Sequence, residues 1–126
     1  MKRNVVDSCG WLEYFADGPN ASFFAPAIEN TKSLVVPVIC IHEVFKKLLK
    51  EKGEEVALRL AAHMLQGEVA DLDRSIALAA AKLGIEHGLP LADSIVLATG
   101  YALDAVVWTQ DADFKSLKGV RYREKK

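Results

Sequence analysis

The segment LADSIVLATGYALDAVVWTQDADF, residues 91–114, predicts a helix that leads directly into a strand. Pro90 suits the start of a helix, so we expect helix from there to Leu103, with Asp93 in its first turn. Residues 105–108 are apolar and β-prone, which predicts a buried strand that ends at Thr109. A helix followed by a short buried strand is the repeating unit of an α/β fold.

The same alternation of strand and helix extends through the rest of the chain. Further short strands are expected at residues 5–6, 34–36, 69–72 and 119–123. Residues 8–10 are expected to form a turn after the first strand, and helices are expected at residues 11–15, 21–29, 41–52, 54–66 and 74–87. The pattern predicts an α/β fold with a central, mostly parallel sheet.

The composition is that of a globular protein. With 126 residues, of which 51% are hydrophobic and 26% charged, the chain suits one domain over residues 1–126. The formal charge of -1 gives no overall attraction to nucleic acid, so a polyanion would need a local basic patch. Cys9 and Cys40 are too few for a disulfide framework, which favours reduced thiols and a cytoplasmic protein. We expect no membrane association, because no apolar run approaches roughly 20 residues and no signal peptide is recognised.

Four acidic side chains are expected at one edge of the predicted sheet. Asp7 and Asp111 each follow a predicted strand, Asp93 lies at a helix N-terminus, and Glu43 opens a helix that follows a strand. Because ligands of open α/β sheets bind beyond the carboxyl ends of the strands, these positions predict a shared site. Each acid alone also has a structural explanation, as a helix cap, a turn residue or a solvated acid in a first helical turn.

Four carboxylates in one cleft would repel one another. At about 4 Å and an effective dielectric constant of 20, each pair of like charges costs on the order of 4 kcal/mol. Either some of the acids are protonated or a divalent cation neutralises them. Since all the ligands would be oxygen atoms, that cation would be Mg²⁺ or Mn²⁺. Such ions serve phosphoryl chemistry, which makes a nucleic-acid phosphodiester the natural substrate.

Other catalytic motifs with a similar beginning fail in this chain. His42 and Glu43 begin like the zincin pattern His-Glu-x-x-His, but Lys46 occupies the position of the second histidine. A haloacid-dehalogenase-type phosphatase needs a second aspartate where Cys9 stands, and a response-regulator receiver needs an acid pair where the chain has only Asp7. Glycine-rich phosphate loops and Gly-x-Ser-x-Gly elbows are absent from the sequence.

The acidic segments resemble those of the PIN-domain family, and closely those of the VapC toxins of bacterial and archaeal toxin–antitoxin pairs. The resemblance extends over essentially the whole chain and rests on residues 5–8 (VVDS), 41–44 (IHEV), 91–98 (LADSIVLA) and 109–114 (TQDADF). The last two segments together are its most specific part. The family implies a PIN-like three-layer α/β/α fold with a central, mostly parallel sheet.

The resemblance also implies an activity, a cofactor and partners. The chain would be a metal-dependent endoribonuclease, the toxin of a type II toxin–antitoxin pair, that hydrolyses RNA (often transfer RNA) through a metal-activated water and leaves a 5′-phosphate and a 3′-hydroxyl. It would form a homodimer, and the C-terminal segment of a VapB-type antitoxin would occupy its active-site groove. Four acids would hold Mg²⁺ or Mn²⁺ and three neighbours would support them: Asp7, Glu43, Asp93 and Asp111, then Ser8, Thr109 and Asp113.

Two groups of basic residues are candidate contacts for RNA phosphates. The first lies in the helix that contains Glu43 and comprises Lys46, Lys47 and Lys50. The second lies at the end of the chain and comprises Arg121, Arg123, Lys125 and Lys126. The alternative for the first group is a solvated helix face paired with nearby glutamates, and for the second a charged tail.

Two other functions stay open beside the ribonuclease. A non-catalytic PIN-like module would bind RNA or a partner without cutting, although the presence of all four acids argues for the enzyme. A phosphoacceptor signalling domain would instead be phosphorylated on one aspartate by a small phosphodonor.

Overall fold

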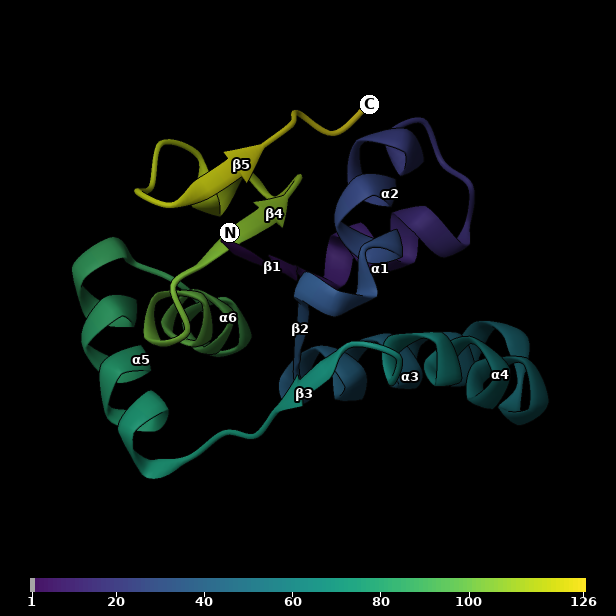
Figure 1. Cartoon of the computed structure of the whole chain (residues 1–126), viewed down its shortest axis with the longest axis horizontal. Coiled ribbons are helices and arrows are strands. Elements are labelled where there is room, and N and C mark those ends of the chain that lie inside the picture. Colours follow the sequence, from purple (N-terminus) through teal and green to yellow (C-terminus); the bar gives the residue numbers. More distant parts are fainter. Residues whose placement is uncertain (1) are drawn as a thin grey trace.

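The computed structural model describes residues 2–126 and builds them around a parallel β-sheet (Figure 1). Met1, the first residue of the predicted domain, lies outside the described residues. The strands are β1 Arg3–Val6, β2 Leu34–Pro37, β3 Glu68–Ala70, β4 Ala105–Thr109 and β5 Val120–Tyr122. They lie in the order β3-β2-β1-β4-β5, and every neighbouring pair is parallel. The predicted α/β fold is therefore confirmed.

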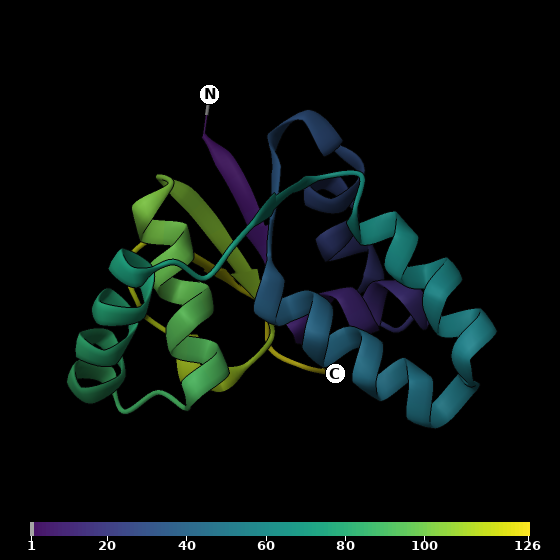
Figure 2. The same cartoon turned by 90° about the horizontal axis from the view of Figure 1, so that it is seen from below.

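Helices cover both faces of this sheet (Figure 2). They are α1 Ser8–Phe15, α2 Ala21–Glu29, α3 Val38–Lys52, α4 Glu54–Met64, α5 Arg74–His87 and α6 Leu91–Ala102, with short 3-10 turns at Thr31–Ser33 and Ala112–Phe114. Helix α6 packs on β1 and β4 from one side with α5 beyond it, while α1 and α2 pack on the same strands from the other side. Helices α3 and α4 pair with each other, and α3 also contacts α1. The layers are those expected of a PIN-like fold.

Two helices begin earlier than the sequence predicts. The turn expected at residues 8–10 is the first turn of α1, because the Asp7 side chain caps that helix by accepting a hydrogen bond from the Ser8 N–H. Helix α3 begins at Val38 and not at residue 41, since Pro37 ends the strand and can stand immediately before a helix. Residues 38–40 are apolar and resemble a continuation of the strand, which hides this boundary. Glu43 consequently lies in the second turn of α3.

The core lies between the sheet and the two helical layers. The central strands contribute valines that are fully inaccessible to solvent, including Val5, Val6, Val35, Val36 and Val107. Trp11 and Phe24 fill the layer on the side of α1 and α2. Within residues 2–126, no helix has both the length and the apolar character needed to cross a bilayer.

Candidate functional site

Three of the predicted acids meet at the carboxyl ends of the central strands. Asp7 follows β1, Asp111 follows β4, and Asp93 lies in the first turn of α6. The backbone N–H of Asp7 donates to the Trp108 carbonyl at 3.0 Å, so the ends of β1 and β4 are held side by side. One carboxylate oxygen from each acid lies within 4.8 Å of the others. The parallel sheet and the start of α6 therefore place three carboxylates in one cluster, which we call the acidic cluster.

Both oxygens of the Asp7 carboxylate are held by hydrogen bonds. Its Oδ1 accepts from the Ser8 N–H at 2.7 Å, and its Oδ2 accepts from the Thr109 hydroxyl at 3.0 Å and from the Cys9 thiol at 3.3 Å. The Thr109 Oγ1 in turn accepts from the backbone N–H of Asp111 at 2.9 Å. The Thr109 hydroxyl therefore positions the Asp7 side chain directly and Asp111 through the Asp111 backbone N–H.

Burial and mutual repulsion raise the pKa of two of these carboxyls. Burial is the main cause for Asp7, whose pKa rises to about 6 although hydrogen bonds from Cys9, Thr109 and Ser8 oppose the rise. The pKa of Asp93 rises to about 8, chiefly by burial and then by the negative charges of Asp7 and Asp111. The ionised cluster is therefore unfavourable as it stands at neutral pH.

No basic side chain compensates the acidic cluster within residues 2–126. The ion pairs of that part of the chain involve other carboxylates, such as Asp104, Glu68 and Glu51. Carboxylates that are crowded together without a counter-charge, and that offer only oxygen ligands, fit a divalent cation such as Mg²⁺ or Mn²⁺. The residues present therefore fit the metal that the family implies.

The fourth predicted acid lies beside the cluster and not within it. Glu43 Oε1 accepts a hydrogen bond of 2.6 Å from the Ser8 hydroxyl, but Glu43 is outside the group of mutually close ligand atoms found in residues 2–126. Glu43 sits in the second turn of α3 and is linked to Asp7 through Ser8. Asp113 is exposed, and its backbone N–H donates to the Asp111 side chain at 2.9 Å.

Two residues near the site were not singled out by the sequence. The Cys9 thiol donates a hydrogen bond to the Asp7 carboxylate, and burial raises the pKa of this thiol to about 12. Asn20 is fully buried and donates to both the Gln110 side chain and the Glu124 carbonyl, at 2.9 and 3.0 Å. The position of Cys9 in the first turn of a helix capped by Asp7 is a local signal that could have revealed the first contact.

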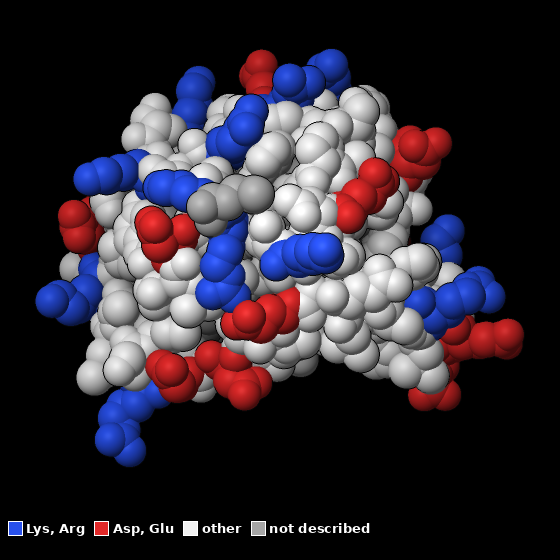
Figure 3. All heavy atoms as spheres, in the orientation of Figure 1, with Lys and Arg blue, Asp and Glu red and all other residues white. Residues whose placement is uncertain are grey.

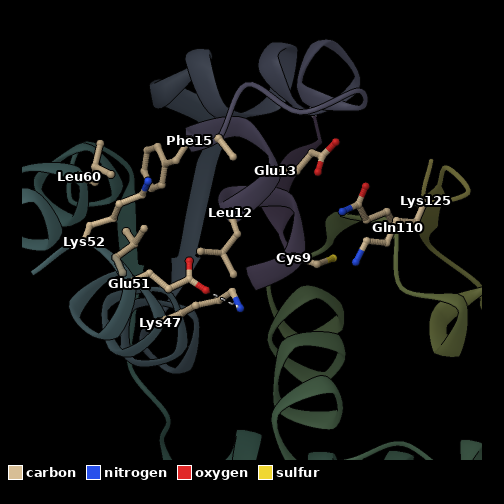
Figure 4. Close-up of a pocket in the computed structure, with 12 residues that line it drawn as sticks. Cys9, Leu12, Glu13, Phe15, Lys47, Glu51, Lys52, Leu60, Gln110 and Lys125 are labelled. Carbon is tan, nitrogen blue, oxygen red and sulfur yellow. Dashed lines mark ion pairs between the residues drawn. The ribbon is translucent and has the colours of Figure 1, made fainter.

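A groove of about 520 Å³ opens next to the cluster (Figure 4). Cys9, Gln110 and Lys125 lie at one end of it, and Phe15, Leu60 and Lys52 lie at the other. Leu12, Leu48 and Leu60 contribute apolar surface to it from α1, α3 and α4, together with charged side chains that include Lys47 and Glu51. A groove of this character suits an amphipathic segment of chain.

The predicted RNA-contact lysines lie along a second groove of about 610 Å³, between α3 and the start of α6. Lys46, Lys47 and Lys50 are exposed and line it together with Glu43. Lys47 is paired with Glu51 at 3.1 Å, four residues further along the helix. One of the three lysines therefore has the alternative role that the sequence suggested, a solvated ion pair.

Comparisons with known proteins agree with this architecture. A family model described as the PIN domain matches residues 5–120. A toxin–antitoxin complex from Klebsiella pneumoniae is similar in structure, with 22% identity over 94% of this chain and 95% of that one and a TM-score of 0.79. DNA-bound VapBC from Salmonella typhimurium has 17% identity over 98% of each chain and a TM-score of 0.76. VapC20 from Mycobacterium tuberculosis, a toxin that cleaves the sarcin–ricin loop, has 16% identity over 90% of this chain and 94% of that one, with a TM-score of 0.72.

At these identities the likeness to solved structures establishes the fold alone, and no curated protein matches the chain in sequence. The family model spans nearly all of the sheet, from the second half of β1 to the start of β5, and includes all the residues of the acidic cluster. The chain therefore belongs to the PIN-domain family.

Proposed function

We propose that this chain is a metal-dependent endoribonuclease and the toxin of a type II toxin–antitoxin pair. The observation that carries the proposal is the acidic cluster, in which Asp7, Asp93 and Asp111 crowd together without a compensating cation in residues 2–126. It lies at the carboxyl ends of parallel strands, where α/β folds bind their ligands. The PIN fold of the chain supports the same conclusion.

The three aspartates of the cluster would hold Mg²⁺ or Mn²⁺, with Glu43 as the fourth acid of the site. When bound, the ion would supply an activated water and would neutralise charge on the phosphate. Thr109 and Cys9 orient the Asp7 carboxylate toward this role by hydrogen bonds to its Oδ2. Ser8 orients Glu43 by donating its hydroxyl proton to Oε1, which leaves Oε2 free to accept a proton from water.

The substrate that this site suits is an RNA phosphodiester. Water adds to the phosphorus, the bond from phosphorus to the 3′-oxygen breaks, and the leaving oxygen takes a proton, so the products carry a 5′-phosphate and a 3′-hydroxyl. Exposed Lys46 and Lys50 beside Glu43 are candidates for the flanking phosphates. That VapC20, a structural neighbour, cleaves the sarcin–ricin loop supports RNA as the substrate class.

An antitoxin and a second copy of the chain are the proposed protein partners. The similar structures include a toxin–antitoxin complex and DNA-bound VapBC assemblies. The groove along α1, α3 and α4 would receive a segment of a VapB-type antitoxin through its apolar lining. A basic antitoxin side chain near the acidic cluster would add electrostatic complementarity.

The proposal is tested with purified protein, a structured RNA such as transfer RNA, and Mg²⁺ or Mn²⁺. We expect cleavage that EDTA abolishes and that Asp93→Asn lowers by at least about 100-fold, because an electrostatic contact in an active site commonly contributes that much. Asp71→Asn makes the same chemical change at an exposed loop position and should cleave normally. Cleavage that persists in EDTA would contradict the metal mechanism, and retention of RNA without cleavage would favour the non-catalytic alternative.

A further inference from the structure

Two arginines at the end of the chain are stacked on aromatic rings. The guanidinium carbon of Arg121 lies 4.4 Å from the centre of the Trp108 ring, and that of Arg123 lies 4.8 Å from the centre of the Phe23 ring. The two rings are themselves in contact, with centroids 5.3 Å apart. Exposed arginine side chains are usually free to move, so this packing restricts both guanidinium groups before any ligand arrives.

The hydrogen-bonding edges of both guanidinium groups are unused. Among residues 2–126, neither Arg121 nor Arg123 takes part in an ion pair or a side-chain hydrogen bond, and both are exposed. A stacked guanidinium keeps its N–H donors in the plane of the group, and those donors match two oxygens of one phosphate. The arginines therefore differ from Lys47, whose charge is already paired with Glu51.

The backbone connects these arginines to the proposed active site. Arg121 lies opposite Trp108 in the pairing of β4 with β5, and the Arg123 N–H donates to the Thr109 carbonyl at 3.1 Å. The hydroxyl of the same Thr109 bonds Asp7. Strand β5 is two strands from β1, about 10 Å across the sheet. An RNA strand bound at the cluster would therefore reach the arginines within a few nucleotides.

Lys125 extends the basic row toward the acidic cluster. It is exposed, and it lines the first groove together with Cys9 and Gln110 (Figure 4). Lys and Arg side chains gather along the upper edge of the molecule in Figure 3, where Figure 1 places β5 and the segment that follows it. Arg121 and Arg123 are alternate residues at the end of β5, about 6.6 Å apart along an extended chain.

We propose that Arg121, Arg123 and Lys125, which we call the basic ridge, bind the phosphate backbone of the RNA substrate beside the acidic cluster. The inference rests on the proposed ribonuclease function. A chain with a net charge of -1 and an acidic site needs local positive charge to hold a polyanion, and the ridge supplies it. Regular spacing and free guanidinium edges favour a nucleic-acid backbone over an acidic protein surface.

The test measures RNA binding separately from cleavage. Full-length protein in EDTA is titrated into a fluorescently labelled transfer RNA at several salt concentrations, with wild type compared against the double variant Arg121→Gln with Arg123→Gln. We expect affinity to fall by about 10-fold or more and the slope of log Kd against log salt to fall by about 1.4, since each lost phosphate contact removes about 0.7. Glutamine removes the charge and the guanidinium group but stays polar at these exposed positions, and the melting temperature of each variant reports whether the fold is retained.

A matched control removes two exposed charges from the far side of the sheet. The double variant Arg74→Gln with Lys82→Gln, both on α5, should leave affinity and salt slope as in wild type. The proposal that the basic ridge binds RNA would be overturned if the two double variants weakened binding equally. It would also be overturned if the ridge variant bound RNA as tightly as wild type.

The failure of the ridge and the failure of the ribonuclease give different results. RNA binding that depends on the ridge, without cleavage in Mn²⁺, would support the role of the ridge and contradict the proposed ribonuclease activity. Cleavage with wild-type kinetics by the ridge variant would support the ribonuclease activity and contradict the role of the ridge in RNA binding.

Discussion

Replacing Asp7 with asparagine is expected to stabilise the metal-free protein at neutral pH. The side chain is 3% exposed, and its burial raises the pKa of the carboxyl from 3.8 to about 6. The folded protein therefore holds this proton more tightly than the unfolded chain does. Its contribution to stability is complete below pH 4, declines as the pH rises toward 6, and is lost above that value. Asparagine has no such proton and no such loss.

The magnitude follows from the pKa change. A rise from 3.8 to about 6 corresponds to about 3 kcal/mol of unfolding free energy in full, most of which is lost between pH 4 and pH 7. Against this, an amide nitrogen in place of Oδ2 could no longer accept the two hydrogen bonds from Thr109 and Cys9, which together cost about 1 to 2 kcal/mol. We expect a net gain of roughly 1 to 2 kcal/mol at pH 7 and a small loss at pH 4.

Urea denaturation in EDTA at pH 4 and pH 7 measures this difference. Asp71→Asn, at an exposed loop position, serves as the control and should change stability little at either pH. An Asp7→Asn variant that is less stable than wild type at pH 7, or a difference that is the same at both pH values, would refute the assignment of Asp7 as a buried, destabilising charge.

Three further predictions concern the metal, the hydroxyl that braces the site and the packing of α1. Mn²⁺ should raise the melting temperature more at pH 8 than at pH 6, because the raised pKa values of the cluster make protons compete with the ion; equal shifts in differential scanning fluorimetry would contradict this. Thr109→Val should weaken Mn²⁺ binding in calorimetry and destabilise the fold by about 1 to 3 kcal/mol, because it removes the hydroxyl that donates to Asp7. Gly10→Ala should destabilise the protein by about 1 to 3 kcal/mol, since its Cβ would lie 2.6 Å from the Phe24 ring; Gly84→Ala, whose nearest neighbour is 3.5 Å away, should be neutral or stabilising in the same urea assay.

The types of element, the parallel sheet and the meeting of three acids could be predicted from the sequence. Runs such as Val5-Val6 and residues 105–108 are apolar enough to indicate buried strands, and helices between strands impose parallel pairing. Parallel strands end at one edge, so Asp7 and Asp111 must come close. Asp93 follows because a helix that returns along the sheet begins at that same edge.

The position of Glu43 could not be predicted in the same way. The apolar run 38–40 suits either a strand or a buried helix, and only packing decides between them. Because α3 begins at Val38, Glu43 meets the Ser8 hydroxyl and lies beside the cluster. Likewise, because Asp7 caps α1, residues 8–10 are helical where the sequence predicts a turn. The Cys9 thiol consequently lies within hydrogen-bonding distance of the Asp7 carboxylate.

By itself, the sequence determined the order and type of the strands and helices and which acids stand near strand ends, because these properties depend on local patterns of apolar and polar residues. The tertiary structure decided the chemistry of the site. Burial raises the pKa of Asp7, and the hydrogen bond that holds its carboxylate comes from Thr109, which is 102 positions away in the sequence. The aromatic rings of Trp108 and Phe23 hold the guanidinium groups of Arg121 and Arg123. Each of these depends on groups that are distant in the chain and meet only when the sheet forms.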